Sequence, residues 1–208
     1  AAITSSGLGQ PLDETNPSEM LGQLTRVSRL GMGGIASAGT APDESKSVQP
    51  SQYGIIDSVY SPESEKAGLD MRLAAGARKG LDGEMYTRVR NARTGKVEWV
   101  TPSHLADKTR AFALEDLKAG NVRALVRNKM DYSHGRDVDY ETVHPEDAYN
   151  PLLQLVPFKG GMKGGRQSMA ARMMTQAVPL VRPEAPLVQT ADPDNPDGSM
   201  EHRHGVRM

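Results

Sequence analysis

The sequence has no cysteine, which excludes a disulfide framework and any metal site built on thiolates. Aromatic residues make up only 4% of the chain and hydrophobic residues 37%, below the share of most globular proteins. The mean hydropathy is -0.54. With so little apolar material, 208 residues are poorly suited to building one large core. We therefore expect a chain that is not an independent compact globule and whose apolar surface is covered by partner chains.

Long hydrophobic runs and an excess of one charge are also missing. No apolar run approaches the roughly 20 residues that cross a bilayer, and no signal-peptide pattern opens the sequence. We expect no membrane partner. The net charge is -1, which argues against a generic binder of polyanions. Any contact with nucleic acid has to come from local clusters of cations.

The first half of the chain carries one strong helix signal. Asn16 and Pro17 are typical of an N-cap and a first helical position, and apolar residues at helical spacing continue to Leu30, before Gly31. The pattern that follows predicts, in order, a Gly/Ala/Ser-rich loop over 31–50, a strand over 53–56 and a helix over 63–78.

The second half is richer in strand signals. Alternating residues on both sides of the turn at 93–96 predict a β-hairpin over 83–101. Further predicted elements are strands over 122–126 and 138–143, a helix that restarts at His144 and is broken at Pro151, and a helix over 166–175. The fold class predicted is α+β, with a helical region at 1–79, a small β-rich lobe at 80–143, a third region at 144–190 and an extended tail at 191–208.

The stretch 155–190 is the most informative part of the sequence. Its only acid is Glu184, against the cations Lys159, Lys163, Arg166, Arg172 and Arg182. Glycines at 160, 161, 164 and 165 allow a backbone to come close to a ligand. Cations beside such a backbone indicate that the ligand carries phosphate.

This stretch resembles a segment of the β subunit of multisubunit DNA-directed RNA polymerases. The family pattern runs L-I-P-F, a spacer, N-R-A-L-M-x-A-N-M-x-R-Q-A-V-P, a second spacer and P-L-V-x-T. It is matched in register at Pro157, Phe158, Arg166, Met169, Ala171, Met173, Gln176–Pro179 and Pro186–Val188.

Two earlier stretches are similar to family motifs that come in the same order. Gln10–Gly34 is similar to Q-x-x-D-x-x-N-P followed by R-x-S-x-L-G-P-G-G, and Val48–Leu69 to V-H-P-x-H-Y-G followed by E-T-P-E-G-P-N-x-G-L. The resemblance implies a fork-like region at 1–79 and the start of the hybrid-binding region at 144–190. Because it covers a central segment of the family pattern, with departures, we expect a divergent split subunit encoded by a virus such as a phage.

The resemblance also implies roles for individual residues. Arg166 is expected to reach the triphosphate of the incoming nucleotide, where a fixed cation offsets the charge that develops during phosphoryl transfer. Gln176 matches a position near the RNA end of the hybrid. The residues expected to bind RNA or DNA are Gln10, Asp13, Arg26, Ser28, Glu63, Lys163, Arg172 and Gln176. No metal ligand is expected in this chain.

The cofactor and the partners follow from the same resemblance. The family's catalytic Mg²⁺ is held by an aspartate triad of the other large subunit, and no such motif is present in this sequence. The chain alone is therefore expected to be inactive, and to serve as a nucleotidyltransferase only within a multisubunit assembly. The partners implied are other β and β′ pieces, template DNA, the RNA transcript and nucleoside triphosphates. The location implied is the cytoplasm of a bacterial host cell or a virion.

The alternative hypothesis is a repurposed structural or virion protein that keeps a polymerase β-like fold without its activity. Two departures from the family pattern favour it. The loop at 36–46 has no arginine, whereas the family's fork loop carries arginines that meet downstream DNA. An acidic H-D-D run that precedes the family's arginine is replaced here by Gly160–Gly165, which contains Lys163.

Several other candidate residues have simpler interpretations. Asp57, Glu63 and Asp70 are interpreted as solvated charges at turns and helix starts rather than as an acid–base pair. A metal site at Glu201–His204 is disfavoured because the spacing matches no standard site. The methionines at 162, 169, 173 and 174 are interpreted as adaptable packing against a partner.

Overall fold

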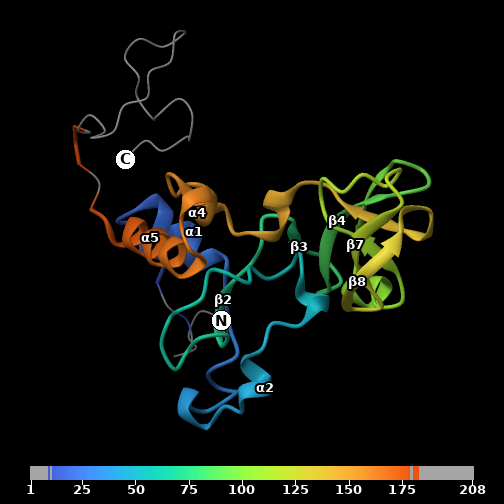
Figure 1. Cartoon of the computed structure of the whole chain (residues 1–208). Helices are drawn as coiled ribbons and strands as arrows, with labels where there is room; N and C mark the ends of the chain where they lie inside the picture. Colours follow the sequence, from blue (N-terminus) through green and yellow to red (C-terminus); the bar gives the residue numbers. More distant parts are fainter. Residues whose placement is uncertain (1–8, 10, 179, 183–208) are drawn as a thin grey trace.

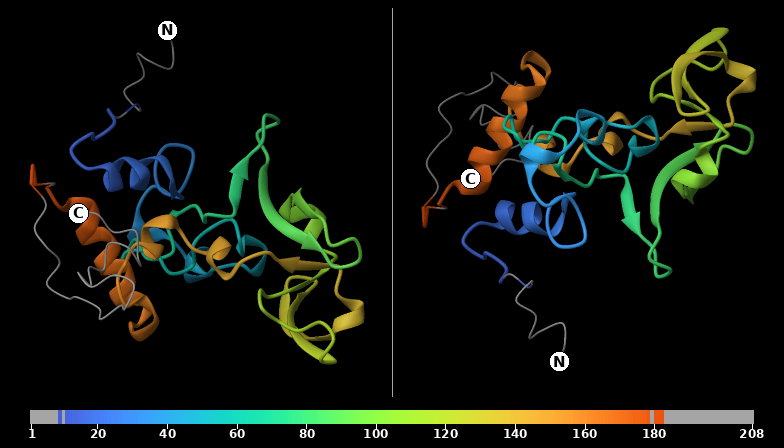
Figure 2. Two further views of the ribbon diagram at one scale, coloured as in Figure 1. Left: turned by 90° about the horizontal axis from the view of Figure 1, so that it is seen from above. Right: turned by 90° about the horizontal axis from the view of Figure 1, so that it is seen from below.

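The computed structural model describes residues 9, 11–178 and 180–182, and the fold is α+β, as predicted. Figure 1 shows two ends: α1, α4 and α5 lie together at one end, and most of the strands form a lobe at the other. The same separation is visible from above and from below (Figure 2). Gln10 and the predicted tail at 191–208 lie outside the described residues.

The lobe is built on a sheet whose strand order is β3-β4-β9-β6-β7-β8, with β5 also paired to β4. Neighbouring strands are antiparallel except for β6 and β9, which are parallel. The strands are β3 (Ala77–Lys79), β4 (Met85–Asn91), β5 (Val97–Val100), β6 (Thr109–Ala111), β7 (Asn121–Val126), β8 (Lys129–His134) and β9 (Tyr140–Thr142). Two small buried clusters hold the lobe together, one around Val89, Leu105 and Tyr140 and one around Ala111, Val122 and Val138.

Most of the strand predictions for the lobe are confirmed. The predicted hairpin is β4 and β5, and the strands predicted over 122–126 and 138–143 are β7 and β9. β6, β8 and the short helix α3 (Pro102–Leu105) were not predicted. β8 follows β7 through a tight turn in which Arg127 and Asn128 have φ of 47° and 59°. Such turns usually use Asn-Gly or Asp-Gly, so the pair Arg-Asn gives little signal in the sequence.

The chain leaves the helical end to form the lobe and then returns to the helical end. The segment that enters the lobe and the segment that leaves it lie side by side at its base. The amide of Ala75 donates to the carbonyl of Tyr149 at 2.9 Å, and that of Gly76 to the carbonyl of Asp147 at 3.0 Å. Arg88 on β4 adds a two-pronged ion pair to the buried Asp147, with Nη2–Oδ1 at 2.5 Å and Nε–Oδ2 at 3.3 Å. The connection between the two ends is therefore braced by both backbone and charge.

Arg110 makes a second brace between the lobe and the first part of the chain. This residue of β6 is 5% exposed, and its Nη2 donates to the carbonyl oxygen of Tyr53 at 2.9 Å. Its guanidinium also lies 4.8 Å from the centroid of the Tyr53 ring. Burial lowers the pKa of Arg110 to about 10. Arg110 therefore remains a cation at neutral pH, and we assign it a structural role.

The helical end is held by α1 (Pro17–Leu24), α4 (Pro151–Gln154) and α5 (Gly164–Gln176). Its core consists of Tyr60, Leu152, Leu153, Val156 and Ala171. The predicted N-cap Asn16 is confirmed, since its side chain accepts a hydrogen bond from the amide of Ser18. The same side chain donates to the carbonyls of Met174 and Ala177, at 2.8 and 2.7 Å, and so fastens α1 to the end of α5.

Several predicted boundaries in the first half are wrong. The first helix ends at Leu24 rather than at Gly31, because β1 (Arg26–Ser28) pairs with β2 (Asp70–Arg72). That pairing also replaces the helix predicted over 63–78, which is a series of turns followed by β2 and β3. In place of the strand predicted over 53–56, only Ile56 forms a bridge, to Leu73. The predicted loop at 31–50 contains the short helix α2 (Asp43–Lys46).

In the second half, the helix predicted to restart at His144 is a 3₁₀ turn over Pro145–Ala148. Pro151 begins α4 instead of breaking a helix, since proline suits the first helical position. The helix predicted over 166–175 is confirmed as α5.

A buried polar cluster around Asp57 and Asn150 joins four segments of the helical end. Asp57 is 1% exposed, and its carboxylate accepts hydrogen bonds from the backbone amides of Val59, Tyr60 and Asn150. The side chain of Asn150, itself fully buried, donates to Thr25 Oγ1 and to the carbonyl of Leu73. These bonds satisfy groups that would be costly to bury alone.

Candidate nucleic-acid interface

α5 has one face packed into the protein and the opposite face open. Ser168, Ala171 and Thr175 are buried, at the three- and four-residue spacing of one helix face. The open face is formed by Arg166, Met169, Met173 and Gln176, which follow the same spacing, with Arg172 at its edge. The helix therefore presents the predicted residues Arg166 and Gln176 along one line, with the predicted residue Arg172 beside that line.

The packed face fixes the orientation of this line. Ser168 Oγ donates to the carbonyl of Ser61 at 2.9 Å, and Ala171 lies in the core beside Tyr60 and Leu152. The hydrogen bonds from the side chain of Asn16 hold the C-terminal end of α5, so the helix is held along its length. Rotation that would turn Arg166 inward would break these contacts. The helix is thus a rigid support for the side chains on its open face.

The glycine-rich loop before α5 is folded back onto the helix. Phe158, at the start of the loop, has φ of 55°, a left-handed conformation that bulky side chains seldom adopt. A 3₁₀ turn over Lys159–Gly161 follows, and Gln167 Nε2 donates to the carbonyls of Lys159 and Met162. Strained backbone persists where the surroundings enforce it, often at functional sites. This loop is held in a defined shape at the start of α5.

The charge on this surface is positive and largely uncompensated. From 159 to 178 the sequence contains four cations and no acid: Lys159, Lys163, Arg166 and Arg172. None of the four forms a salt bridge within the described part of the chain. No side chain caps the first turn of α5 there, so its amides add partial positive charge. The surface can therefore attract phosphate.

Glu63 lies beside the start of α5. Its carboxylate lies so close to Gly165 that a side chain at Gly165 would collide with it. Glu63 is exposed, in agreement with its interpretation as a solvated charge. The structure thus brings the predicted residues Glu63, Lys163 and Arg166 together at one end of the helix.

The earlier group of predicted residues is placed differently. Arg26 forms a bidentate ion pair with Asp70, with contacts of 2.9 and 3.1 Å, so its guanidinium is already engaged. Ser28 is exposed, and its Oγ accepts from the amide of Leu30. Asp13 is exposed, and a hydrogen bond from Thr15 lowers its pKa below the usual value. Asp13 lies three residues before Asn16, which reaches the end of α5 where Gln176 is located.

The interpretation of Asp57 and Asp70 as solvated charges is wrong. Asp57 is buried among backbone amides, and burial raises its pKa above the usual 3.8. Asp70, 8% exposed, bridges Arg26 and Arg72. Both have structural partners that the sequence did not indicate, because Arg26 is 44 positions from Asp70 and Asn150 is 93 from Asp57.

A hollow of about 450 Å³ lies beside the glycine-rich loop. It is lined by Val59, Tyr149, Leu153, Lys159, Gly164 and Gln167, among others. Within the described residues, no three histidine or acidic side chains are grouped as a metal site would require. In the same part of the chain, no helix has the length and hydrophobicity needed to cross a membrane.

Comparison with known proteins finds similarity to RNA polymerase sequences. The family model of RNA polymerase Rpb2, domain 3, matches residues 10–78, which include α1, β1 and β2. The match falls on the part of the chain that supports α5 and that carries Asp13, Arg26 and Ser28.

The chain is also similar to β subunits of DNA-directed RNA polymerases along most of its length. It is 34% identical over 197 residues to the subunit of Streptomyces avermitilis, 34% over 198 residues to that of Gloeobacter violaceus and 33% over 197 residues to that of Aquifex aeolicus. These alignments cover 89%, 89% and 90% of this chain, but only 17%, 18% and 13% of the relatives. The chain spans less than a fifth of the length of these proteins.

Proposed function

We propose that this chain is one piece of a divergent multisubunit DNA-directed RNA polymerase, encoded by a virus. In the assembly it lines the nucleotide, RNA and fork side of the active centre. The observation that carries the proposal is the open face of α5. This face carries Arg166, with Arg172 at its edge, on a helix that is anchored along its length. The chain that contains it is similar in sequence to β subunits over most of its length.

In this proposal the chain supplies charge and position rather than the metal. Lys163 and Arg166, beside the uncapped start of α5, hold the phosphates of the incoming nucleotide. Arg172 and Gln176, further along the helix, face the RNA. Mg²⁺ is held by another subunit, and the remaining β and β′ pieces supply the rest of the nucleic-acid path. The chain is inactive alone, and it works in the cytoplasm of a bacterial host or is carried in a virion.

A non-catalytic structural role is the second candidate, and one observation favours it. Met169 is 37% exposed and Met173 71% exposed, and both lie on the same open face as Arg166. Methionine adapts to irregular protein surfaces, so this face also suits cover by another protein chain. The two candidates differ in what covers α5 in the assembly.

The proposal is tested by purifying the assembly from its native source through an affinity tag on this chain. We expect the purified assembly to contain a subunit with an aspartate triad and to make RNA from a DNA template in the presence of Mg²⁺. The tagged chain purified by itself serves as the control and should make none. An assembly that contains no such subunit and makes no RNA would instead support the structural role.

A further inference from the structure

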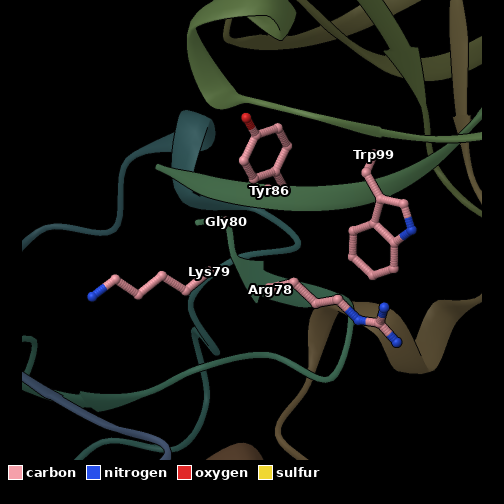
Figure 3. Close-up of a pocket in the computed structure, with 5 residues that line it drawn as sticks. All are labelled: Arg78, Lys79, Gly80, Tyr86 and Trp99. Carbon is pink, nitrogen blue, oxygen red and sulfur yellow. The ribbon is translucent and has the colours of Figure 1, made fainter. Parts of the chain in front are cut away.

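A second surface, on the lobe, combines exposed aromatic rings with cations. A cavity of about 270 Å³ is lined by Arg78, Lys79, Gly80, Tyr86 and Trp99. These residues come from β3, β4 and β5 and the turn after β3, as Figure 3 shows. The cavity is slightly smaller than most sites for whole small molecules, which begin at about 300 Å³. It is suited to one planar group of a larger ligand.

Strand register explains why these side chains meet. Arg78 is directly opposite Tyr86 in the β3–β4 pair, and Arg88 is opposite Trp99 in the β4–β5 pair. Because Tyr86 and Arg88 are two residues apart on β4, all four lie on the same face of the sheet. The guanidinium carbon of Arg78 is 4.6 Å from the centroid of the Trp99 ring. This contact holds the indole beside Arg78, while Trp99 remains 38% exposed and lines the cavity.

The cations on and beside this face differ in whether they form salt bridges. Lys79 follows Arg78 on β3 and so belongs to the other face of the strand, but it still lines the cavity. Arg88 and Arg90 are paired with Asp147 and Glu141. Arg78 and Lys79 have no salt bridge within the described residues. In Figure 3, Arg78 extends beneath Trp99 and Lys79 extends the opposite way. A ligand lying across the aromatic rings therefore meets an unpaired cation toward each end.

Two acidic residues, Asp82 and Glu84, lie close enough to Tyr86 to act on its hydroxyl. The hydroxyl of Tyr86 donates to Asp82 at 2.5 Å, and this bond lowers the pKa of Asp82 below its usual value. Asp82 is thus charged but does not line the cavity. The two acids limit how far an anion can extend past Tyr86, so phosphates are expected at Arg78 and at Lys79 instead.

We propose that this surface binds single-stranded nucleic acid, with a base stacked on Trp99 and the neighbouring phosphates held by Arg78 and Lys79. An open indole together with flanking cations is the combination that binds single strands without sequence preference. An acidic protein segment would use the cations but would leave the exposed indole face without a planar partner. The site lies in the lobe, whereas α5 lies at the opposite end of the molecule (Figure 1), so it is independent of the function proposed for α5.

Trp99 is the single tryptophan of the sequence, which makes the test specific. The full chain is titrated with oligothymidylate and with oligouridylate of about twelve nucleotides, within the usual site size of such surfaces. We expect stacking to quench the tryptophan fluorescence with one or both strands, and the better quencher identifies the preferred sugar. Fluorescence anisotropy of labelled strands gives the affinity of each variant.

Replacement of Trp99 by leucine is expected to weaken binding by at least about tenfold. Arg78→Ala and Lys79→Ala should each reduce the slope of log affinity against log salt by about 0.7. Matched controls are Tyr132→Leu and Lys129→Ala, an exposed aromatic and an exposed cation on β8 at the far edge of the sheet. Both should bind as the unchanged chain does, and circular dichroism checks that every variant keeps its fold.

Three outcomes would overturn the proposal. The first is that neither strand quenches the fluorescence, and the second is that the control variants lose as much affinity as the test variants. The third is that polyglutamate quenches as strongly as nucleic acid, which would indicate an acidic protein ligand. If a variant does not fold, a second experiment is used in its place. A benzophenone amino acid is introduced at Val97, which is 49% exposed on the same face, in the chain within its native assembly. Cross-linking to single-stranded nucleic acid from Val97 then supports the site, and its absence rejects it. A negative result at Trp99 leaves the proposal for α5 unchanged.

Discussion

Replacement of Arg166 by alanine is expected to slow nucleotide addition by the assembled enzyme by on the order of a hundredfold. The guanidinium is exposed at the start of α5, with Met169 Sδ, at 3.7 Å, as its hydrogen-bond contact within the described residues. It is thus available to a triphosphate. A fixed cation that acts on developing charge contributes a few kcal/mol in the transition state, about the size of this effect.

The measurement is single-nucleotide extension of an RNA primer by the purified assembly. Arg166→Lys should lose less than Arg166→Ala, because it keeps the charge but not the forked geometry. Arg136→Ala, at an exposed arginine of the lobe, is the matched control and should extend at the normal rate. Equal rates for Arg166→Ala and Arg136→Ala would remove Arg166 from the substrate site.

Replacement of Asp57 by alanine is expected to lower the free energy of unfolding by about 2–4 kcal/mol. The change leaves three backbone amides, those of Val59, Tyr60 and Asn150, without their acceptor in a buried site. Asp57→Asn should cost less, because an amide oxygen can still accept from Val59 and Tyr60. Asp116→Ala is the control, since Asp116 is exposed and its side chain accepts only from the amide of Lys118 within the described residues. Urea denaturation measures all three.

The pH dependence of the same transition has a predicted sign. Burial raises the pKa of Asp57 in the folded chain, so the folded state binds the proton more tightly than the unfolded state does. The stability linked to this group is therefore fully present below the usual pKa of 3.8, and it is lost as the pH rises through the raised pKa. Asp57→Asn should abolish this component. Identical pH profiles for Asp57→Asn and the unchanged chain would contradict the assignment.

What the sequence predicts well is what local signals determine. α5 follows from its spacing of small and apolar residues, and the β4–β5 hairpin from alternation around a turn that contains Gly95, whose φ is 70°. The predictions fail where distant pairing decides the structure. Val27 continues the apolar spacing of α1, but it pairs with Met71 in β2 instead. Gly68, whose φ is 71°, and Gly76 interrupt the helix predicted over 63–78.

In the candidate site, too, local features could be predicted from the sequence and long-range contacts could not. The cations of α5 could be named from the sequence because they lie within a short stretch that has its own pattern. The direction in which they point could not be predicted, because it depends on hydrogen bonds between α5 and two distant residues. Ser61 and Asn16 are 107 and 158 positions from their partners on α5. The ion pair that engages Arg26 likewise depends on Asp70, which the sequence presents as an ordinary acid near a turn.

Whether α5 faces RNA is tested most directly by cross-linking from the 3′ end of the RNA in the native assembly. A photoreactive nucleotide is incorporated at that end, and the labelled segment of this chain is mapped by proteolysis and mass spectrometry. We expect labelling within Lys159–Gln176, because Lys163, Arg166, Arg172 and Gln176 are exposed on the loop and on α5. Labelling that avoids this segment, in an assembly whose structure shows α5 covered only by protein, would contradict it.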